Sequence, residues 1–382
     1  MKGLPKSLSD KLNQRIDANS LRRLGHDDGL VDFSSNDYLG LSASAKIFND
    51  AHDYLVDNGI ISNGSTGSRL ISGNHYLYEM TEKVVADFHH AESALIFNSG
   101  YDANVGFFES VPQKGDVILY DEFIHASIRD GIRLSNAAAY KSRHNDLESL
   151  KTLIERHKDK ADEVYVVTES IFSMDGDGPD LDILADICVT TNCRLVVDEA
   201  HAVGIFGDKG EGLIAGMSLQ DKVFAWIVTF GKALGCHGAA ILCSNELRSY
   251  LINFARSFIY TTALPPHSLA TILAAYNFLD TALGDTKPSL HITEFFLEEV
   301  KRLRLTNFIP SVSAIQCAII PCNEKVKQIA ASLHQHGFSV KPILSPTVPK
   351  GQERLRFCLH AYNTKEQVTR VLELLTEALL YP

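Results

Sequence analysis

The chain has 382 residues, of which 45% are apolar and 22% are charged, and its formal net charge is -11. This composition is ordinary for a globular protein, and the length exceeds what one hydrophobic core usually covers, so we expect a large domain with a smaller companion. The negative charge argues against a nucleic-acid partner, because a phosphate-binding face usually carries an excess of lysine and arginine.

Membrane, export and metal signals are also missing from the sequence. There is no apolar stretch of about 18 residues or more, and the first residues read as a polar helix without a secretory core, so we expect a cytoplasmic protein with no membrane span. The 7 cysteines are odd in number and show neither a CxxC pair nor the spacing of a zinc site. We therefore predict buried free thiols and no metal.

Short apolar runs alternate with stretches of helical period along the first 285 residues. The runs that we interpret as strands cover residues 94–99, 116–121, 137–142, 164–170, 194–199, 225–231 and 238–243. Several are apolar at nearly every position, as strands covered on both faces must be. The alternation predicts an α/β fold with a mainly parallel seven-stranded sheet and helices on both faces. The last run follows a short glycine-containing link, so we expect it to be antiparallel to a neighbour.

The pattern changes after about Thr286. Three further strands are indicated at residues 313–320, 338–344 and 354–360, with helices between them, which is typical of a small α+β unit. We therefore expect three parts: an N-terminal segment (1–40), a large α/β domain (41–285) and a small C-terminal α+β domain (286–382).

Polar residues follow the predicted strands at the edge where ligands bind in open α/β sheets, beyond the carboxyl ends of the strands. They are Ser99, Gly100, Tyr101, His125, Glu169, Ser173, Asp198, His201, Thr229 and Lys232. Lys232 offers an amine for a Schiff base with a carbonyl cofactor, and Asp198 offers a carboxylate that can keep a pyridine nitrogen protonated. A single lysine or histidine at such a place is most often a solvated loop residue or a helix cap. The convergence of the whole set predicts pyridoxal 5'-phosphate.

Motifs along nearly the whole chain resemble the α-oxoamine synthase family, pyridoxal-phosphate enzymes of fold type I that condense an amino acid with an acyl thioester and release carbon dioxide. The motifs are FSSNDYLGL, ISGN, NSGYDAN, DEFIHAS, VTESIFSMDGD, VVDEAHAVGIFG, VTFGKALG, FARSFIYTTALPP, SAIQ, PTVP and RLRF, in this order. Within the family the resemblance is strongest to the 8-amino-7-oxononanoate synthases. It implies L-alanine and pimeloyl-CoA or a pimeloyl-carrier protein as substrates, a role in biotin biosynthesis, and a homodimer with shared active sites.

The same resemblance implies roles for individual residues. Lys232 would hold the cofactor and act as a base, Asp198 would pair with the ring nitrogen, and His125 would stack on the ring as a third catalytic residue. The other implied cofactor contacts are Ser99, Gly100, Tyr101, Glu169, Ser173, His201, Thr229 and, across the dimer interface, Thr262. The implied substrate contacts are Asn36, Thr347, Arg356 and Arg22, with Arg23 as an alternative to Arg22.

Two departures from the oxononanoate synthase pattern leave other family members open. The stretch GSTGSRLISGN carries Arg69 where these synthases often have glycines, and Cys236 and His237 replace small residues. Ligases that form 2-amino-3-ketobutyrate, 5-aminolevulinate synthases and serine palmitoyltransferases therefore remain alternatives. A non-catalytic subunit should lack the lysine that is present as Lys232, and a regulatory module should carry an additional DNA-binding domain. An aminotransferase would share the lysine and aspartate but not the ordered motifs.

Overall fold

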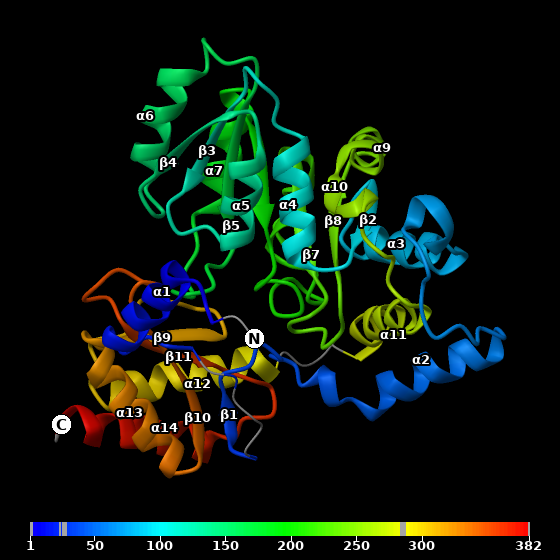
Figure 1. Cartoon of the computed structure of the whole chain (residues 1–382). Coiled ribbons are helices and arrows are strands. Elements are labelled where there is room, and N and C mark those ends of the chain that lie inside the picture. Colours follow the sequence, from blue (N-terminus) through cyan, green and yellow to red (C-terminus); the bar gives the residue numbers. More distant parts are fainter. Residues whose placement is uncertain (1–2, 23, 25–28, 283–287, 381–382) are drawn as a thin grey trace. The chain divides into compact units, whose positions relative to one another are not determined.

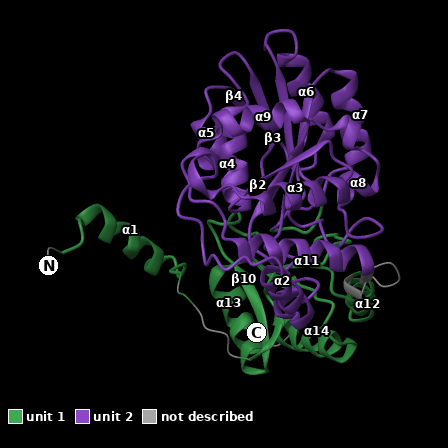
Figure 2. Ribbon diagram, turned by 90° about the vertical axis from the view of Figure 1, so that its right-hand side faces the viewer, with its two compact units in different colours: residues 1–36, 174–177, 288–382 green, residues 37–173, 178–287 purple. Residues whose placement is uncertain are grey.

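The chain folds into two compact units (Figure 2), and the computed structural model describes residues 3–22, 24, 29–282 and 288–380. Unit 1 consists of Met1–Asn36, Met174–Asp177 and Pro288–Pro382, and unit 2 of Asp37–Ser173 and Gly178–Lys287. The contacts thus group the first 36 residues with the C-terminal part of the chain. The predicted boundary between residues 285 and 286 lies outside the described residues.

Unit 2 is built on a seven-stranded sheet with the order β2-β8-β7-β6-β5-β3-β4 (Figure 1). The strands are β2 (Ser93–Phe97), β3 (Val117–Asp121), β4 (Ala138–Ser142), β5 (Val164–Glu169), β6 (Arg194–Asp198), β7 (Ala225–Thr229) and β8 (Ala239–Cys243). Strands β3 to β7 are parallel to their neighbours among themselves, whereas β8 is antiparallel to both β7 and β2. The predicted fold, including the antiparallel last strand, is confirmed.

Helices cover both faces of this sheet. The helices of unit 2 are α2 (Ala45–Asp57), α3 (Tyr76–Phe88), α4 (Gly100–Ser110), α5 (Ala126–Leu134), α6 (Leu147–His157), α7 (Leu181–Thr190), α8 (Leu213–Gly216), α9 (Asn245–Phe254), α10 (Arg256–Ile259) and α11 (Pro266–Ala282), with short turns η1 (Leu41–Ala43), η2 (Arg69–Gly73) and η3 (Gln220–Lys222), and not all of them pack on the sheet: α2 packs on α11. Phe107 of α4, Ile128 of α5 and Leu251 of α9 belong to one core cluster with Leu95 and Ile227 of the sheet. Helices α3, α6 and α7 also contact strands of this sheet, but they contribute no residue to that cluster.

The apolar runs explain why both faces need a cover. Successive side chains of a strand point to opposite faces, yet every residue of β2 is buried, from Ser93 to Phe97. The same holds for β5, β7 and β8. Such strands would expose apolar surface if either layer of helices were missing, at about 25 cal/mol for each Å².

Unit 1 contains a smaller sheet with the order β1-β10-β11-β9. Its elements are α1 (Lys6–Asp17), β1 (Val31–Phe33), α12 (Pro288–Arg302), β9 (Ile315–Ile319), α13 (Asn323–Gln335), β10 (Phe338–Ile343), β11 (Arg354–Cys358) and α14 (Lys365–Leu380). The three predicted strands are present as β9, β10 and β11, which pair antiparallel. The prediction missed β1, which lies parallel to β10 and pairs Val31 with Phe338. Three residues are too few to show a period of two.

The cysteines and the helices bear on two further predictions. All seven cysteines are free and five are buried, but Cys236 is half-buried and Cys322 is exposed, so the prediction of burial is wrong for Cys322. Cys322 precedes α13 at a positive φ of 86°, in a surface turn rather than a strand. Within the described part of the chain, no helix has both the length and the apolar character needed to cross a bilayer.

Candidate active site

Lys232 lies in a tight turn directly after β7, at the carboxyl edge of the large sheet. The turn is closed by two backbone hydrogen bonds, from Gly235 N–H to Lys232 C=O at 2.9 Å and from Cys236 N–H to Phe230 C=O at 2.7 Å. Gly235 has a φ of 63°, and a Cβ there would collide with the backbone of Ser42. Glycine is therefore required at this position by both conformation and space, and it fixes where the lysine stands.

The amine of Lys232 contacts a histidine that is itself held by a buried tyrosine. Lys232 Nζ lies 2.7 Å from His201 Nε2, and His201 Nδ1 lies 2.7 Å from the hydroxyl of Tyr38. His201 is 5% exposed and Tyr38 is 1% exposed, so water has little access to either ring. The sequence analysis did not single out Tyr38. Its place in the motif NDYLGL was the only available signal.

Asp198 ends β6 and is buried with two hydrogen-bond donors. Its Oδ1 accepts from the backbone N–H of Ala200 at 2.9 Å, and its Oδ2 accepts from Asn104 Nδ2 at 2.8 Å. Asp198 is 5% exposed and Asn104, on α4, is 2% exposed. A buried carboxylate held by two donors is a suitable partner for a protonated ring nitrogen. Asn104 is a second residue that the sequence analysis missed.

His125 begins α5 and acts as its N-cap. Its Nδ1 accepts from the backbone N–H of Ser127 at 3.3 Å and lies 2.7 Å from Ser127 Oγ. Enclosure by neighbouring atoms is the largest influence on the ring and lowers the pKa of His125, and Lys232 acts in the same direction, whereas Asp198 opposes it. The imidazole is therefore favoured in its neutral form.

Glu169 ends β5 and pairs in register with Asp198 on the neighbouring strand. It is 3% exposed, and burial together with the Asp198 carboxylate raises the pKa of Glu169 to about 8. Backbone N–H groups of His125 and Ser173 donate to its carboxyl group and oppose this rise. These hydrogen bonds hold the segments that contain His125 and the half-buried Ser173 at the end of β5. Both are predicted site residues.

The N-terminus of α4 lies beside Thr229 at the end of β7. Ser99 caps the helix by accepting from Asp102 N–H at 3.1 Å, and the Cα of Gly100 faces Thr229 so closely that a Cβ would lie 3.7 Å from its hydroxyl oxygen. The first N–H groups of a helix have no partner inside the helix and attract anions such as phosphate. The side chain of Tyr101 is half exposed and donates to Asp130 at 2.7 Å.

Thr262 lies near this helix within the same chain. Its carbonyl oxygen accepts from the side chain of Asn98, the residue after β2, at 2.7 Å. Thr262 is exposed. Its predicted contribution to a partner subunit stays a prediction.

The four predicted substrate residues form two pairs inside unit 1. Arg356 of β11 is 6% exposed and donates from Nη2 to Asn36 Oδ1 at 2.9 Å. Arg22 Nη2 approaches Thr347 Oγ1 at 3.4 Å, and both of these residues are exposed. Arg23, the alternative to Arg22, lies outside the described residues.

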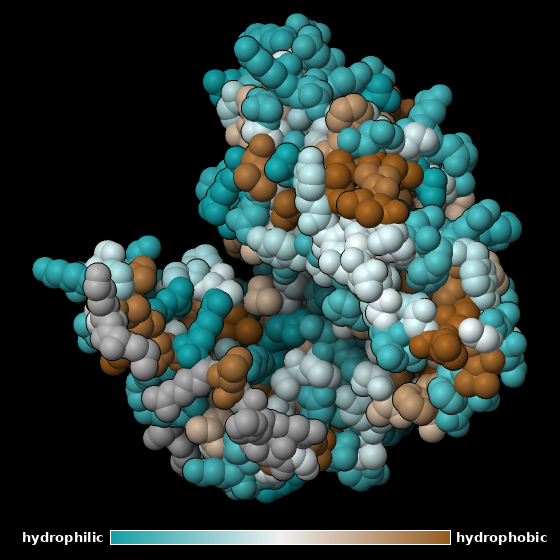
Figure 3. All heavy atoms as spheres, turned by 45° about the vertical axis from the view of Figure 1, so that its right-hand side comes forward, coloured by the Kyte–Doolittle hydropathy of each residue, from teal (hydrophilic) through white to brown (hydrophobic). Residues whose placement is uncertain are grey.

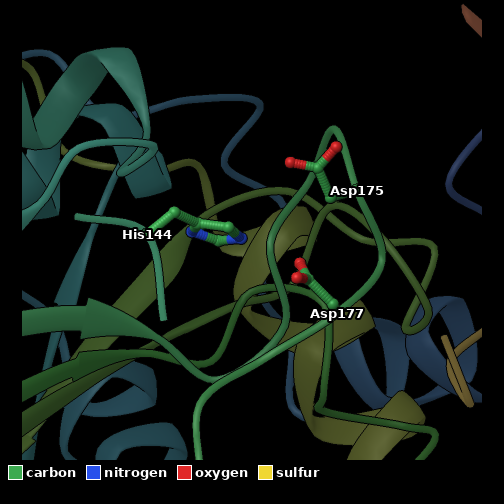
Figure 4. Close-up of side chains that lie close together, drawn as sticks. All are labelled: His144, Asp175 and Asp177. Carbon is green, nitrogen blue, oxygen red and sulfur yellow. The ribbon is translucent and has the colours of Figure 1, made fainter. Parts of the chain in front are cut away.

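Three further ionisable side chains, His144, Asp175 and Asp177, are drawn in Figure 4. In unit 2, His144 Nδ1 lies 2.9 Å from Asp121 Oδ1. In unit 1, Asp175 forms a buried ion pair with Arg354. Because His144 and Asp175 already have charged or polar partners inside their own units, we propose no metal for them.

The donor set of unit 2 fits pyridoxal phosphate. It offers an amine at Lys232, a buried carboxylate at Asp198 and a helix N-terminus at Gly100, which match the carbonyl, the ring nitrogen and the phosphate of that cofactor. In addition, Glu169 Oε1 and Asn104 Oδ1 are buried without a hydrogen-bond partner among the described residues. Buried polar atoms are rarely left unpaired, so a bound group or water is expected beside them.

Comparisons with known proteins agree with this geometry. The family model of aminotransferase class I and II matches residues 28–375. An 8-amino-7-oxononanoate synthase of Emericella nidulans is 40% identical over 394 residues, covering 97% of this chain and 95% of the relative. The solved 8-amino-7-oxononanoate synthase of Francisella tularensis is 30% identical with a TM-score of 0.78, covering 93% of this chain and 99% of that one. A serine palmitoyltransferase structure that holds pyridoxal phosphate has a TM-score of 0.88 at 24% identity, covering 98% and 96% of the two chains, which bears on the fold alone.

Proposed function

Because the chain belongs to the aminotransferase class I and II family and is a pyridoxal-phosphate enzyme of fold type I, we propose that it condenses L-alanine with a pimeloyl thioester. The reaction releases carbon dioxide and the free thiol and gives 8-amino-7-oxononanoate. The observation that carries the proposal is the 40% identity to an 8-amino-7-oxononanoate synthase across 97% of this chain.

Lys232 has two tasks in this proposal. Its amine would hold the cofactor covalently in the absence of substrate. The free Nζ then takes the Cα proton of the amino acid and later returns a proton to the product, as a general base and acid. His201, 2.7 Å away, accepts a hydrogen bond from the lysine and keeps the amine on the side of the reacting carbon. When bound, the cofactor supplies a conjugated ring that takes up the electron pair left at Cα.

Asp198 keeps that electron sink effective by holding a proton on the ring nitrogen. Its carboxylate is fixed by Asn104 and by the backbone N–H of Ala200. A buried carboxylate favours the protonated ring because the charge pair is shielded from water. His125, favoured as the neutral imidazole, would contact the ring of the cofactor.

Arg356 is proposed to bind the carboxylate of the amino acid. The guanidinium offers parallel donors that match the two carboxylate oxygens. Asn36 Oδ1 accepts from Nη2 and restricts the orientation of the guanidinium, so the fork is set before the substrate arrives. Arg22 and Thr347 are proposed to meet the acyl substrate.

A homodimer is proposed as the working form, with Thr262 acting on the partner's cofactor. Apolar surface on unit 2 supports it, since Ile61 and Ile71 are 90% and 85% exposed and Leu70 and Phe254 are more than half exposed. Apolar areas of this kind are visible as brown spheres in Figure 3. Large exposed apolar groups that gather on a surface are typical of protein interfaces.

The substrate assignment is tested by incubating the purified holoenzyme with thioesters of acetyl, succinyl, pimeloyl and palmitoyl groups, each paired with glycine, alanine and serine. Release of free thiol and carbon dioxide should be fastest for pimeloyl with alanine. A faster reaction of glycine with acetyl or succinyl groups, or of serine with a palmitoyl group, would instead identify one of the other members of the α-oxoamine synthases. Coenzyme A and carrier-protein thioesters should be compared in parallel.

A further inference from the structure

Two buried side chains outside the predicted site connect Asp198 to His125. Asn104 Nδ2 lies 2.8 Å from Asp198 Oδ2 and 3.0 Å from Ser127 Oγ. Ser127 Oγ lies in turn 2.7 Å from His125 Nδ1. Asn104 is 2% exposed and Ser127 is fully buried, so water cannot replace either contact easily.

The chemistry of these groups sets the direction of each hydrogen bond. If the amide of Asn104 were turned round, its oxygen would face the carboxylate of Asp198, so the NH2 group must point there. The two amide hydrogens serve Asp198 and Ser127, and the oxygen of Ser127 is therefore an acceptor from Asn104. This arrangement leaves the hydroxyl hydrogen of Ser127 free to donate to His125.

The ring proton of His125 is set by the same contacts. The backbone N–H of Ser127, which can only donate, points to His125 Nδ1 at 3.3 Å. A hydrogen on Nδ1 would oppose this N–H, so Nδ1 is an acceptor. In the neutral ring the proton then lies on Nε2.

We propose that Asn104 and Ser127 form a relay that positions the Asp198 carboxylate and fixes His125 as a neutral imidazole with its proton on Nε2. Both are positioning residues, and the inference rests on the proposed roles of Asp198 and His125. In this relay the same two side chains orient both Asp198, the proposed partner of the ring nitrogen, and His125, the imidazole proposed to stack on the ring.

Several charged groups act on His125 and must be considered with the relay. Asp198 from β6 and Asp130 from α5 favour the protonated ring, whereas Lys232 from the turn after β7 opposes it. The carboxyl of Glu169, from β5, accepts from the backbone N–H of His125. Ser127 adds two donors to Nδ1 and tips this balance further toward the neutral ring.

The tautomer and the pKa of His125 can be measured directly by nitrogen NMR of the holoenzyme labelled with 15N-histidine, with His125→Ala to identify the signal. In the wild type, Nε2 should carry the proton at neutral pH. Ser127→Ala removes one of the two donors to Nδ1 and should raise the pKa of His125 by about 0.5–1 unit. Ser110→Ala is the matched control, because Ser110 is a buried serine of α4 that donates only to the Gly106 carbonyl, at 2.6 Å.

The link through Asn104 is tested with a double-mutant cycle. Asn104→Ala should weaken pyridoxal-phosphate affinity about tenfold or more, through Asp198, and should also raise the pKa of His125. The effects of Asn104→Ala and Ser127→Ala on that pKa should be less than additive. Ser127→Cys keeps the packing but has only a weak donor, so it replaces the alanine variant if that variant does not fold. The pKa of His125 in Ser127→Cys should lie between the wild-type value and the value expected when this donor is lost completely.

The relay is overturned if His125 in the wild type carries its proton on Nδ1, or if Ser127→Ala and Ser110→Ala leave its pKa equally unchanged. Neither readout depends on turnover. A failure of the substrate assignment would therefore leave the NMR result intact, whereas a failure of the relay would leave the thioester assay intact.

Discussion

Asp198→Asn should weaken the binding of pyridoxal phosphate, and it should separately lower the stability of the apoprotein. Both oxygens of Asp198 accept hydrogen bonds, from Ala200 N–H at 2.9 Å and from Asn104 Nδ2 at 2.8 Å. An asparagine offers only one acceptor oxygen, so one of these donors loses its partner, at about 1–3 kcal/mol. The variant also removes the negative charge opposite the ring nitrogen, and a hydrogen bond to a charged group is worth about 1.5–3 kcal/mol.

The loss of this charged hydrogen bond, about 1.5–3 kcal/mol, corresponds to about 10- to 150-fold weaker cofactor binding. The assay prepares apoprotein, titrates it with pyridoxal phosphate and follows absorbance, while urea unfolding of the apoprotein measures stability separately. Asp116→Asn is the matched control, because Asp116, directly before β3, is a buried aspartate that accepts from two backbone N–H groups, of Gln113 at 2.7 Å and Glu163 at 3.1 Å. Equal cofactor affinity in the two variants would refute the assignment of Asp198.

Three further outcomes are expected. Arg356→Lys keeps the charge but loses the fork, so the KM for alanine should rise about 10- to 100-fold in steady-state assays with unchanged cofactor content; a change in thioester KM instead would move Arg356 to the other substrate. Glu82→Gln leaves Arg69 and Arg248 without their buried partner, at 2.5 and 2.7 Å in the wild type, and should lower the free energy of unfolding by about 3 kcal/mol in urea titrations. Burial raises the pKa of Glu199 to about 8, so the folded state retains a proton that the unfolded chain releases above about pH 4.5. Stability should therefore fall with rising pH between about 4.5 and 8, by up to about 1.4 kcal/mol for each pH unit relative to Glu199→Gln, and parallel pH profiles of the two proteins would contradict this.

The large sheet could be predicted because its signal is local. Runs such as residues 164–170 and 194–199 are apolar along their length, and only a strand between two layers of helices buries both faces of such a run. The antiparallel β8 could be predicted because its connection is too short for a crossover.

The missed parts depend on contacts that no short pattern contains. Tyr38 and Asn104 matter because of the side chains that tertiary structure brings to them, His201 and Asp198, which lie 163 and 94 residues further along the chain. The sequence placed Tyr101 at the correct helix, but it does not tell whether the backbone or the side chain of this residue faces the site. In the structure the side chain donates a hydrogen bond to Asp130. Residue types and their positions after the strands were therefore enough to locate the site. The hydrogen bonds that hold its residues in place could be identified only in the folded chain.

Unit 1 combines segments from the beginning and the end of the chain, and this affects the order in which the chain can fold during synthesis. Strand β1 (Val31–Phe33) pairs only with β10 (Phe338–Ile343) in the small sheet, so it must wait until residue 338 and those after it have been made. Unit 2 needs nothing beyond Lys287 for its own contacts. At about 5–20 residues per second, translation from residue 288 to residue 338 takes roughly 3–10 s. During that interval β1 lacks its sheet partner and is accessible to proteases and chaperones, although the unit that carries Lys232 can already be folded.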